Sequence, residues 1–343
     1  MPTPTSPSPL GADRPIRWGF LGAGGIAVKV AQDLAHTPGN TLAAVAARDL
    51  GRAQEFAGRY GADVRGYGDY RALVEDPEVD VVYLATTHPM HHDQALLAIE
   101  AGKPVLIEKP VCLNAADTSA VFEAAASAGV FAMEAMWMRT NPLIRRAQQL
   151  VADGVLGEVR AVRAEMSLGR PYDPGHRLYD LANGGGALLD LGVYPVTFAW
   201  LWLGEPDRVA VSGSLAPTGA DATVGLQWSY ADGRDAQLWC STLTGGPFRG
   251  VVLGSAGWLE FDGRFYRPTG MTLTTADGHR ERFADPLDPE LPGYRPEIEE
   301  VERCLRAGLL TSELVPPAET IAIMRQLDAA RAELGVRYPN ETD

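Results

Sequence analysis

The hydrophobic positions of the chain follow one pattern up to about residue 136 and a different one beyond it. In the first stretch, short apolar runs alternate with segments of helical periodicity. Strands are expected at 16–21, 41–47, 79–85, 104–107 and 130–134, and helices at 27–35, 51–60, 91–101 and 115–128. Strands separated by helices form right-handed βαβ units. Residues 15–136 are therefore predicted to be an α/β domain with a doubly wound parallel sheet.

The second stretch, residues 137–343, contains many short strands in succession. Between residues 208 and 282, apolar runs alternate with turn sequences such as PTGAD, ADGR and FDGR, and this spacing indicates antiparallel hairpins. Further elements are expected as a strand at 159–168 and helices at 142–153, 186–203, 297–307 and 316–334. The pattern predicts an α+β domain with a mostly antiparallel sheet.

Composition and charge narrow the range of partners. The chain has 343 residues, enough for two domains, and a formal net charge of −14. An acidic surface repels nucleic acids and anionic membranes, so neither is expected to be a partner. No apolar run reaches the roughly 18 residues of a membrane span. Residues 1–14 are typical of a disordered tail and lack the apolar core of a signal peptide.

The cysteines point to a reducing compartment. Cys112, Cys240 and Cys304 are odd in number and scattered along the chain, which fits neither a disulfide framework nor a zinc site. All three are expected to be buried thiols. We therefore expect a cytoplasmic protein.

A glycine-rich loop follows the first predicted strand and opens the first helix. It reads G-x-G-x-x-A from Gly22 through Gly24, Gly25 and Ile26 to Ala27. In such a loop the first glycine permits a tight turn, and the second lets a pyrophosphate approach the backbone at the helix N-terminus. Any tight strand-to-helix turn favours glycine, but the position on the first strand of a βαβ array favours a dinucleotide site.

The end of the second predicted strand bears on which dinucleotide is bound. NAD enzymes usually place a carboxylate there for the ribose hydroxyls, whereas an arginine can hold the 2′-phosphate of NADP. Arg48 comes first and Asp49 follows it, which favours NADP, with NAD as the alternative. The alternative structural interpretation is a solvated Arg–Asp pair in a loop.

Two further segments follow strand ends, where ligands of open α/β sheets bind. The segment from Thr86 to His92 holds three histidines, of which His88 and His91 are candidates to contact substrate. No cysteine lies near them, so no metal is expected. His92 also fits a solvated helix start. Glu108-Lys109-Pro110 follows the fourth strand of the array, and its lysine would lower the pKa of a nearby hydroxyl or donate a proton itself, unless it is a solvated strand-end lysine.

A third segment lies in the second domain, where Gly184, Gly185 and Gly186 precede a strongly apolar helix. Asp190 and Tyr194 are four positions apart in it and are expected on one helix face. Polar groups on a buried helix need a reason, which is either a proton relay or a structural Asp–Tyr hydrogen bond.

Taken together, these segments resemble the Gfo/Idh/MocA oxidoreductases, and most of all the branch of dimeric dihydrodiol dehydrogenases and NADP-dependent D-xylose dehydrogenases. The matching pieces are GFLGAGGIA, AVAARDLGRA, THPMHH, EKP, MEAMWMR and GGGALLDLGVYP, in the family's order across about residues 15–335. The resemblance implies an N-terminal Rossmann domain and a C-terminal domain with a large open sheet, whose outer face often forms a homodimer or a higher oligomer.

The resemblance also implies roles for individual residues. Lys109 would lie beside the nicotinamide, and Asp190 and Tyr194 would assist proton transfer. Many sugar dehydrogenases of the wider family have histidine in place of Tyr194. The residues expected to bind cofactor are Gly22, Gly24, Gly25, Ile26, Arg48, Thr86, Glu108, Lys109, Pro110, Trp137 and Arg139. The residues expected near substrate are His88 and His91, together with His176 and Arg177, which lie in a loop without a dependable family match.

The expected activity is hydride transfer between a nicotinamide and a CH–OH or C=O group of a sugar, polyol or cyclic diol. In this mechanism Tyr194 exchanges the hydroxyl proton, Lys109 lowers the pKa of Tyr194, and Asp190 orients the pair. Two alternatives share the fold: a dinucleotide-dependent glycosidase with no net cofactor turnover, and a non-catalytic dinucleotide-binding sensor.

Overall fold

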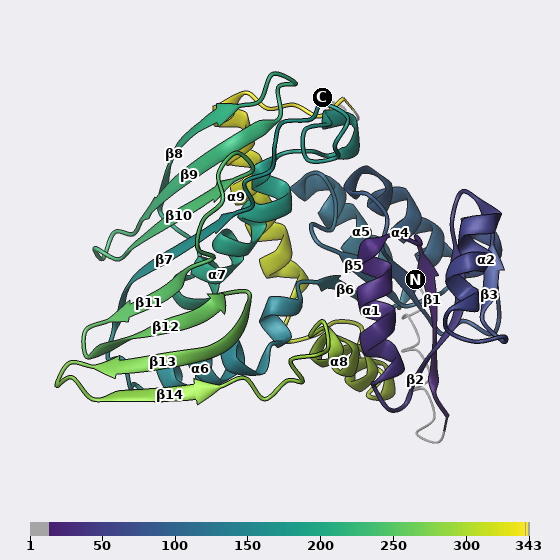
Figure 1. The fold of residues 1–343 in the computed structure, drawn as a ribbon, viewed down its shortest axis with the longest axis horizontal. Coiled ribbons are helices and arrows are strands. Elements are labelled where there is room, and N and C mark those ends of the chain that lie inside the picture. The colour runs from purple at the N-terminus through teal and green to yellow at the C-terminus, as the bar shows by residue number, and fades with distance from the viewer. Residues whose placement is uncertain (1–13, 340, 342–343) are drawn as a thin grey trace. The chain divides into compact units, whose positions relative to one another are not determined.

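The protein, described here from a computed structural model at residues 14–339 and 341, forms two compact units (Figure 1). The first comprises Met1–Trp137 with Leu287–Ile321, and the second Met138–Pro286 with Ala322–Asp343. The segment 287–321 thus packs with the first unit, although it follows the second in sequence. Of the predicted tail, residues 1–13 lie outside the described residues. Arg14 donates hydrogen bonds to the Asp80 carboxylate at 2.6 and 3.0 Å.

The first unit is built on a six-stranded parallel sheet in the order β3-β2-β1-β4-β5-β6. Its strands are β1 Ile16–Leu21, β2 Asn40–Ala46, β3 Arg65–Tyr67, β4 Val81–Leu84, β5 Val105–Glu108 and β6 Ala132–Ala135. The strand order reverses between β1 and β4, so the carboxyl ends of these two strands border the crevice where such sheets bind ligands. This confirms the predicted parallel sheet.

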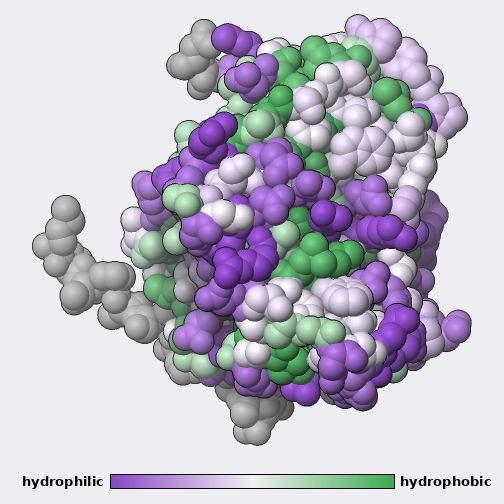
Figure 2. Space-filling view, turned by 90° about the vertical axis from the view of Figure 1, so that its left-hand side faces the viewer, coloured by the Kyte–Doolittle hydropathy of each residue, from purple (hydrophilic) through white to green (hydrophobic). Residues whose placement is uncertain are grey.

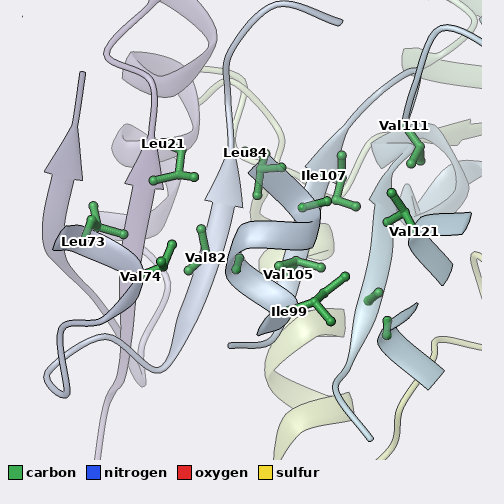
Figure 3. Packing of buried hydrophobic residues seen from close by; sticks show 14 of the residues in the cluster. Leu21, Leu73, Val74, Val82, Leu84, Ile99, Val105, Ile107, Val111 and Val121 are labelled. Carbon is green, nitrogen blue, oxygen red and sulfur yellow. The ribbon is translucent and has the colours of Figure 1, made fainter. Parts of the chain in front are cut away.

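Helices cover this sheet, and α3, α4 and α5 share an apolar cluster with its strands. The helices are α1 Gly25–Ala35, α2 Leu50–Gly58, α3 Tyr70–Val74, α4 His91–Glu100, α5 Ala115–Ala128 and α8 Arg295–Arg306, with the 3₁₀ turns η1 His88–Met90 and η2 Trp137–Thr140. Figure 3 shows the branched side chains of β1, β4 and β5 packed against those of α3, α4 and α5. Burial of this apolar surface fixes the strand ends that carry the candidate residues.

The second unit contains an eight-stranded sheet in the order β14-β13-β12-β11-β7-β10-β9-β8. Its strands are β7 Val159–Ser167, β8 Arg208–Leu215, β9 Asp221–Ser229, β10 Asp235–Ser241, β11 Gly250–Gly254, β12 Gly257–Arg264, β13 Arg267–Thr275 and β14 Arg280–Ala284. Among the described strands of this second sheet, only β7 and β10 pair in parallel. The prediction of a mostly antiparallel sheet is therefore confirmed. The helix α6 Pro142–Ala152 precedes this sheet, and α9 Pro317–Leu334 runs from the first unit into the second.

The helix predicted over 186–203 differs in its first turns. After the 3₁₀ turn η3 Leu181–Asn183, the segment η4 Leu188–Gly192 is π-helical, and only Val193–Leu203 is the α-helix α7. Within the stretch Leu181–Leu203, one 18-residue window has a mean hydropathy of 1.3, which by length and composition alone is enough to cross a membrane. However, 83% of this window is buried inside the protein. It is the core helix that packs against β7 and β10.

Candidate active site

The glycine-rich loop leaves an open space at the N-terminus of α1. Gly22 has a φ of +111°, and a methyl group there would lie 2.7 Å from the Ala85 carbonyl oxygen. By contrast, a methyl group on Gly24 or Gly25 would meet nothing within 4 Å among the described residues. No side chain caps the first turn of α1, where Ile26 lies half-buried. Backbone N–H groups at a helix start with space before them fit a pyrophosphate.

Arg48 and Asp49 follow β2 and have different surroundings. Asp49 is the N-cap of α2, where its Oδ1 accepts a hydrogen bond from Arg52 N at 2.8 Å. One oxygen of its carboxylate therefore caps the helix. The side chain of Arg48 is exposed beside it. An exposed guanidinium at this strand end is a group that suits a 2′-phosphate.

The histidine segment after β4 is fixed by backbone contacts. The His91 ring is fully buried, with Nδ1 3.1 Å from the Pro110 carbonyl oxygen and Nε2 3.3 Å from that of Thr86. Burial lowers the pKa of His91. His88 is also buried, with its ring centroid 5.8 Å from that of His91. With one ring nitrogen facing each carbonyl, His91 bridges the loops that follow β4 and β5.

The remaining residues of this segment have local partners. The Thr86 hydroxyl donates to Gln94 Oε1 at 2.6 Å, and partly exposed His92 lies 2.9 Å from the Asp93 carboxylate. Across residues 14–339 and 341, no group of three or more His, Cys, Asp or Glu side chains is placed to hold a metal ion. The three cysteines are free and buried, as predicted.

Glu108 and Lys109 lie at the end of β5. Glu108 is buried, accepts a hydrogen bond from the Tyr83 hydroxyl at 2.6 Å, and accepts another from its neighbour Lys109 N at 3.1 Å. The Lys109–Pro110 peptide bond is cis. Lys109 itself is half-buried. The glutamate thus faces back into the fold, and the lysine is the more accessible of the pair.

Helix α8 adds residues that the sequence pattern did not single out. Glu297 is fully buried, and burial together with the nearby Glu108 and Glu134 raises its pKa well above the ordinary value. The backbone N–H of Tyr294 donates to Asp33 Oδ2 at 2.5 Å. The ring of Tyr294 stacks on Trp137 with centroids 4.2 Å apart. These contacts join positions more than 150 residues apart, so local periodicity carried no signal for them.

The second unit gathers the candidate proton-transfer residues. Asp190 is buried, and both of its carboxylate oxygens accept hydrogen bonds from Arg177 at 3.1 Å. Tyr194, also buried, lies against Tyr266 with ring centroids 4.7 Å apart. The sequence analysis did not single out Tyr266, because it lies in the turn between β12 and β13. A tyrosine in a turn is not conspicuous in the way that a polar residue within an apolar helix is. Arg177, expected near substrate, forms an ion pair with Asp190.

Two more candidates belong to this unit. His176 is half-buried, and its Nδ1 accepts a hydrogen bond from Leu178 N at 3.2 Å. Burial, followed by the charge of Arg170, lowers the pKa of His176. Arg139 is buried in η2. Each unit therefore assembles its own share of the predicted residues: a dinucleotide-type loop with a lysine in the first, and a buried carboxylate and phenol in the second.

Comparison with known families and proteins agrees with both halves. Residues 16–136 match an oxidoreductase family with an NAD-binding Rossmann fold, and residues 144–260 match the GFO/IDH/MocA C-terminal domain. Trans-1,2-dihydrobenzene-1,2-diol dehydrogenase of Mus musculus is 35% identical over 336 residues, which cover 95% of this chain and 99% of that protein. The Homo sapiens protein of the same name is 33% identical over 335 residues, with coverage of 95% and 99%.

Solved structures share the fold over nearly the whole chain. KijD10, a 3-ketoreductase from Actinomadura kijaniata in complex with NADP and TDP-benzene, has a TM-score of 0.80 at 26% identity, covering 93% of this chain and 98% of its own. An aldose–aldose oxidoreductase from Caulobacter crescentus complexed with glycerol has a TM-score of 0.83 at 24% identity, covering 94% and 98%, and this likeness concerns the fold alone.

Proposed function

Since the chain belongs to the GFO/IDH/MocA family of NAD(P)-binding oxidoreductases, we propose that it transfers hydride between a nicotinamide and a CH–OH or C=O group of a cyclic diol or sugar. The observation that carries this proposal is the similarity to dihydrodiol dehydrogenases along 95% of the chain. The open space at the start of α1 supports the binding of a dinucleotide there.

NADP is the proposed cofactor, and when bound it supplies the carbon that gives or takes the hydride. Gly22, Gly24, Gly25 and Ile26 would hold its pyrophosphate. Exposed Arg48 at the end of β2 supports the preference for a 2′-phosphate. The NADP complex of the similar 3-ketoreductase also supports it.

The proposed proton chemistry uses three side chains of this chain. Tyr194 would exchange the proton of the substrate hydroxyl, and Lys109 would stabilise the negative charge that develops on that oxygen. The bidentate ion pair with Arg177 holds the Asp190 carboxylate in one orientation, from which it would orient the proton-transfer groups.

A spectrophotometric scan tests this proposal. The purified protein would be assayed with both cofactors against dihydrodiols, sugars and polyols, and the net change in NADPH or NADH recorded. Turnover with net reduction or oxidation supports hydride transfer. Cofactor that co-purifies and never changes net redox state, together with release of a sugar substituent, would show the glycosidase. Binding without turnover would show the sensor.

Lys109→Met separates chemistry from binding within that assay. Loss of the ammonium should lower kcat about 10²–10⁴-fold, because it removes a group that acts in the transition state, while NADP binding stays measurable. Lys29→Met is the matched control, since Lys29 is exposed on α1. Unchanged turnover in the Lys109 variant would exclude the role proposed for this lysine.

The proposed assembly is a homodimer formed through the open face of the eight-stranded sheet. Half-buried apolar side chains of Trp239, Val251 and Trp258 lie there beside the charged Arg163 and Glu260, lining a shallow hollow. Figure 2 shows hydrophobic residues interspersed with hydrophilic ones on the side that carries β8–β14. The buried free thiols support our proposal of a cytoplasmic location.

A further inference from the structure

The first residue of β9, Asp221, contacts the triple-glycine turn from inside the second unit. Its side chain is fully buried, and Oδ2 accepts a hydrogen bond from Leu188 N at 2.5 Å. Leu188 is the first residue of η4, the π-helical turn that contains Asp190 and leads into Tyr194. The Asp221 carboxylate therefore binds the start of the helical segment that carries both candidate proton-transfer residues.

The turn packs closely against its neighbours because Gly185 and Gly186 have no side chains. Gly186 has a φ of +142°, and a methyl group there would overlap Asp221 Oδ1. On the other side of the turn, Gly185 N donates to the Asp180 carbonyl oxygen at 2.9 Å, and a methyl group on Gly185 would lie 2.6 Å from the Arg177 carbonyl oxygen. The turn is thus clamped between Asp221 and the loop that supplies Arg177 to Asp190.

A carboxylate is an unusual group for this buried place. Oδ1 has no hydrogen-bond partner among the described residues. Burial raises the pKa of Asp221 to about 6, although the backbone N–H groups of Leu188, Asp221 itself and Ala187, together with the charge of Arg331, favour the ionised form. The charge of Asp221 in turn contributes to raising the pKa of Cys240 and of Tyr338. An apolar side chain in this place would avoid the cost of desolvating a carboxylate, so the carboxylate calls for a role.

We propose that Asp221 is a positioning residue: by binding Leu188 N and filling the space above Gly186, it fixes the helical segment on which Asp190 and Tyr194 are carried. The catalytic meaning of this inference rests on the proposed function. A displacement of reacting groups by about 1 Å lowers a rate by about 10²-fold. Because Asp221 binds the backbone at Leu188, two residues before Asp190, it is able to control turnover without touching substrate.

The test compares Asp221→Ala and Asp221→Asn with Asp235→Asn, which alters the half-buried carboxylate at the start of the neighbouring strand β10. Amide hydrogen exchange of wild type and variants is measured by mass spectrometry. In Asp221→Ala, exchange of peptides covering residues 186–194 should rise about tenfold, with the six-stranded sheet of the first unit unchanged. Asp221→Asn keeps an acceptor for Leu188 N and should restore much of the protection. Unchanged or uniformly raised exchange would overturn the proposal.

Kinetics on the substrate found in the scan provide the second measurement. Asp221→Ala should lower kcat about tenfold or more with the KM for NADP within about twofold, and Asp221→Asn should recover part of kcat. An equal kcat in Asp221→Ala and wild type would overturn the positioning role. If wild type turns over no substrate, the proposed function fails, while the exchange result still decides whether Asp221 anchors the turn.

Gly186→Ala disturbs the same contact from the opposite side. The methyl group would displace the Asp221 carboxylate, so this variant should show the same local rise in exchange. The strain of a side chain at a φ of +142° remains in the double variant Gly186→Ala/Asp221→Ala, but the clash with the carboxylate disappears. The double variant should therefore be less exchange-prone than the sum of the two single effects. Additive increases would mean that the two residues act separately, and would overturn the proposal.

Discussion

Arg48 and Asp49 are neighbours at the end of β2, and the different surroundings of their side chains predict a cofactor preference. Asp49 caps α2, whereas Arg48 is exposed beside it. Arg48→Ala is expected to weaken NADP binding by about 10–100-fold, the equivalent of about 1.5–3 kcal/mol for hydrogen bonds to a charged group, and to leave NAD binding nearly unchanged. Calorimetric titration of each variant with both cofactors measures this difference.

The control for that titration is Arg59→Ala, which removes an exposed arginine from the opposite end of α2. It should change neither affinity by more than about twofold, because surface charges at a distance are screened. An equal loss of NADP and NAD affinity in the Arg48 variant would contradict recognition of the 2′-phosphate.

Single residues differed in how far the sequence revealed them. Lys109 and Tyr194 stood out because polar groups after a buried strand or within an apolar helix are costly without a role. Glu297 and Asp221 did not, because one looks like an ordinary helix-start acid and the other like a turn residue before a strand. Their burial arises from contacts with distant segments, α8 against the parallel sheet and β9 against the triple-glycine turn. Local pattern contains no trace of such contacts.

At the scale of elements, the loop between β1 and α1 predicts opposite outcomes for two glycines. Gly22→Ala should destabilise the fold by about 1–3 kcal/mol, because a side chain at a φ of +111° is strained and meets the Ala85 carbonyl. Gly24→Ala should leave the Tm nearly unchanged, since its extended φ of −91° suits alanine and the space before it is open.

Gly24→Ala, the substitution that should leave the fold intact, is expected to weaken cofactor binding. In Gly24→Ala, the methyl group occupies the space through which a pyrophosphate would approach the backbone, so NADP affinity should fall at least about tenfold despite the intact fold. Thermal melts and calorimetric titrations of both variants provide the comparison. Full NADP affinity in Gly24→Ala would rule out this loop as the pyrophosphate site.

Helix α8 predicts a pH-dependent stability through Glu297. The raised pKa means that the folded protein keeps a proton that the unfolded chain releases. This stabilisation is complete below about pH 4, the ordinary pKa of glutamate, and is lost as the pH rises through the folded pKa. Glu297→Gln stays neutral at every pH, so it should gain stability relative to wild type with rising pH, by about 1.4 kcal/mol per unit within that range.

Melting curves from about pH 5 to about pH 9 measure this prediction. Glu299→Gln on the same helix is the control, because Glu299 is exposed and pairs with Arg295 one turn away. It should follow the wild-type curve within about 0.5 kcal/mol. Parallel curves for wild type and Glu297→Gln would show that Glu297 does not hold an extra proton in the folded state.

The elements themselves were predictable where their patterns were long. Ile16–Leu21 and Ala115–Ala128 have the predicted bounds, because each is a continuous run with clear ends. The three-residue β3 and the five-residue α3 were missed, since neither is long enough to show a period. The π-helical start of 188–203 also escaped prediction, because it depends on Asp221 and on the turn rather than on the apolar side chains that follow.

At the scale of the whole molecule, the open face of the eight-stranded sheet predicts a dimer. Trp239 on β10 and Trp258 on β12 line the hollow of this face and are only partly buried, and large aromatic side chains of this kind are enriched at the centres of interfaces. We expect wild type to have the mass of a dimer in size-exclusion chromatography with light scattering, and Trp239→Glu to shift to a monomer, since a charge at the centre of an interface would be buried without a partner.

Leu50→Glu, a substitution at a 47% exposed leucine of the first unit, should leave the dimer intact. If Trp239→Glu keeps the wild-type mass, the subunits associate through some other surface; if wild type is a monomer, the apolar residues of this face serve a different purpose.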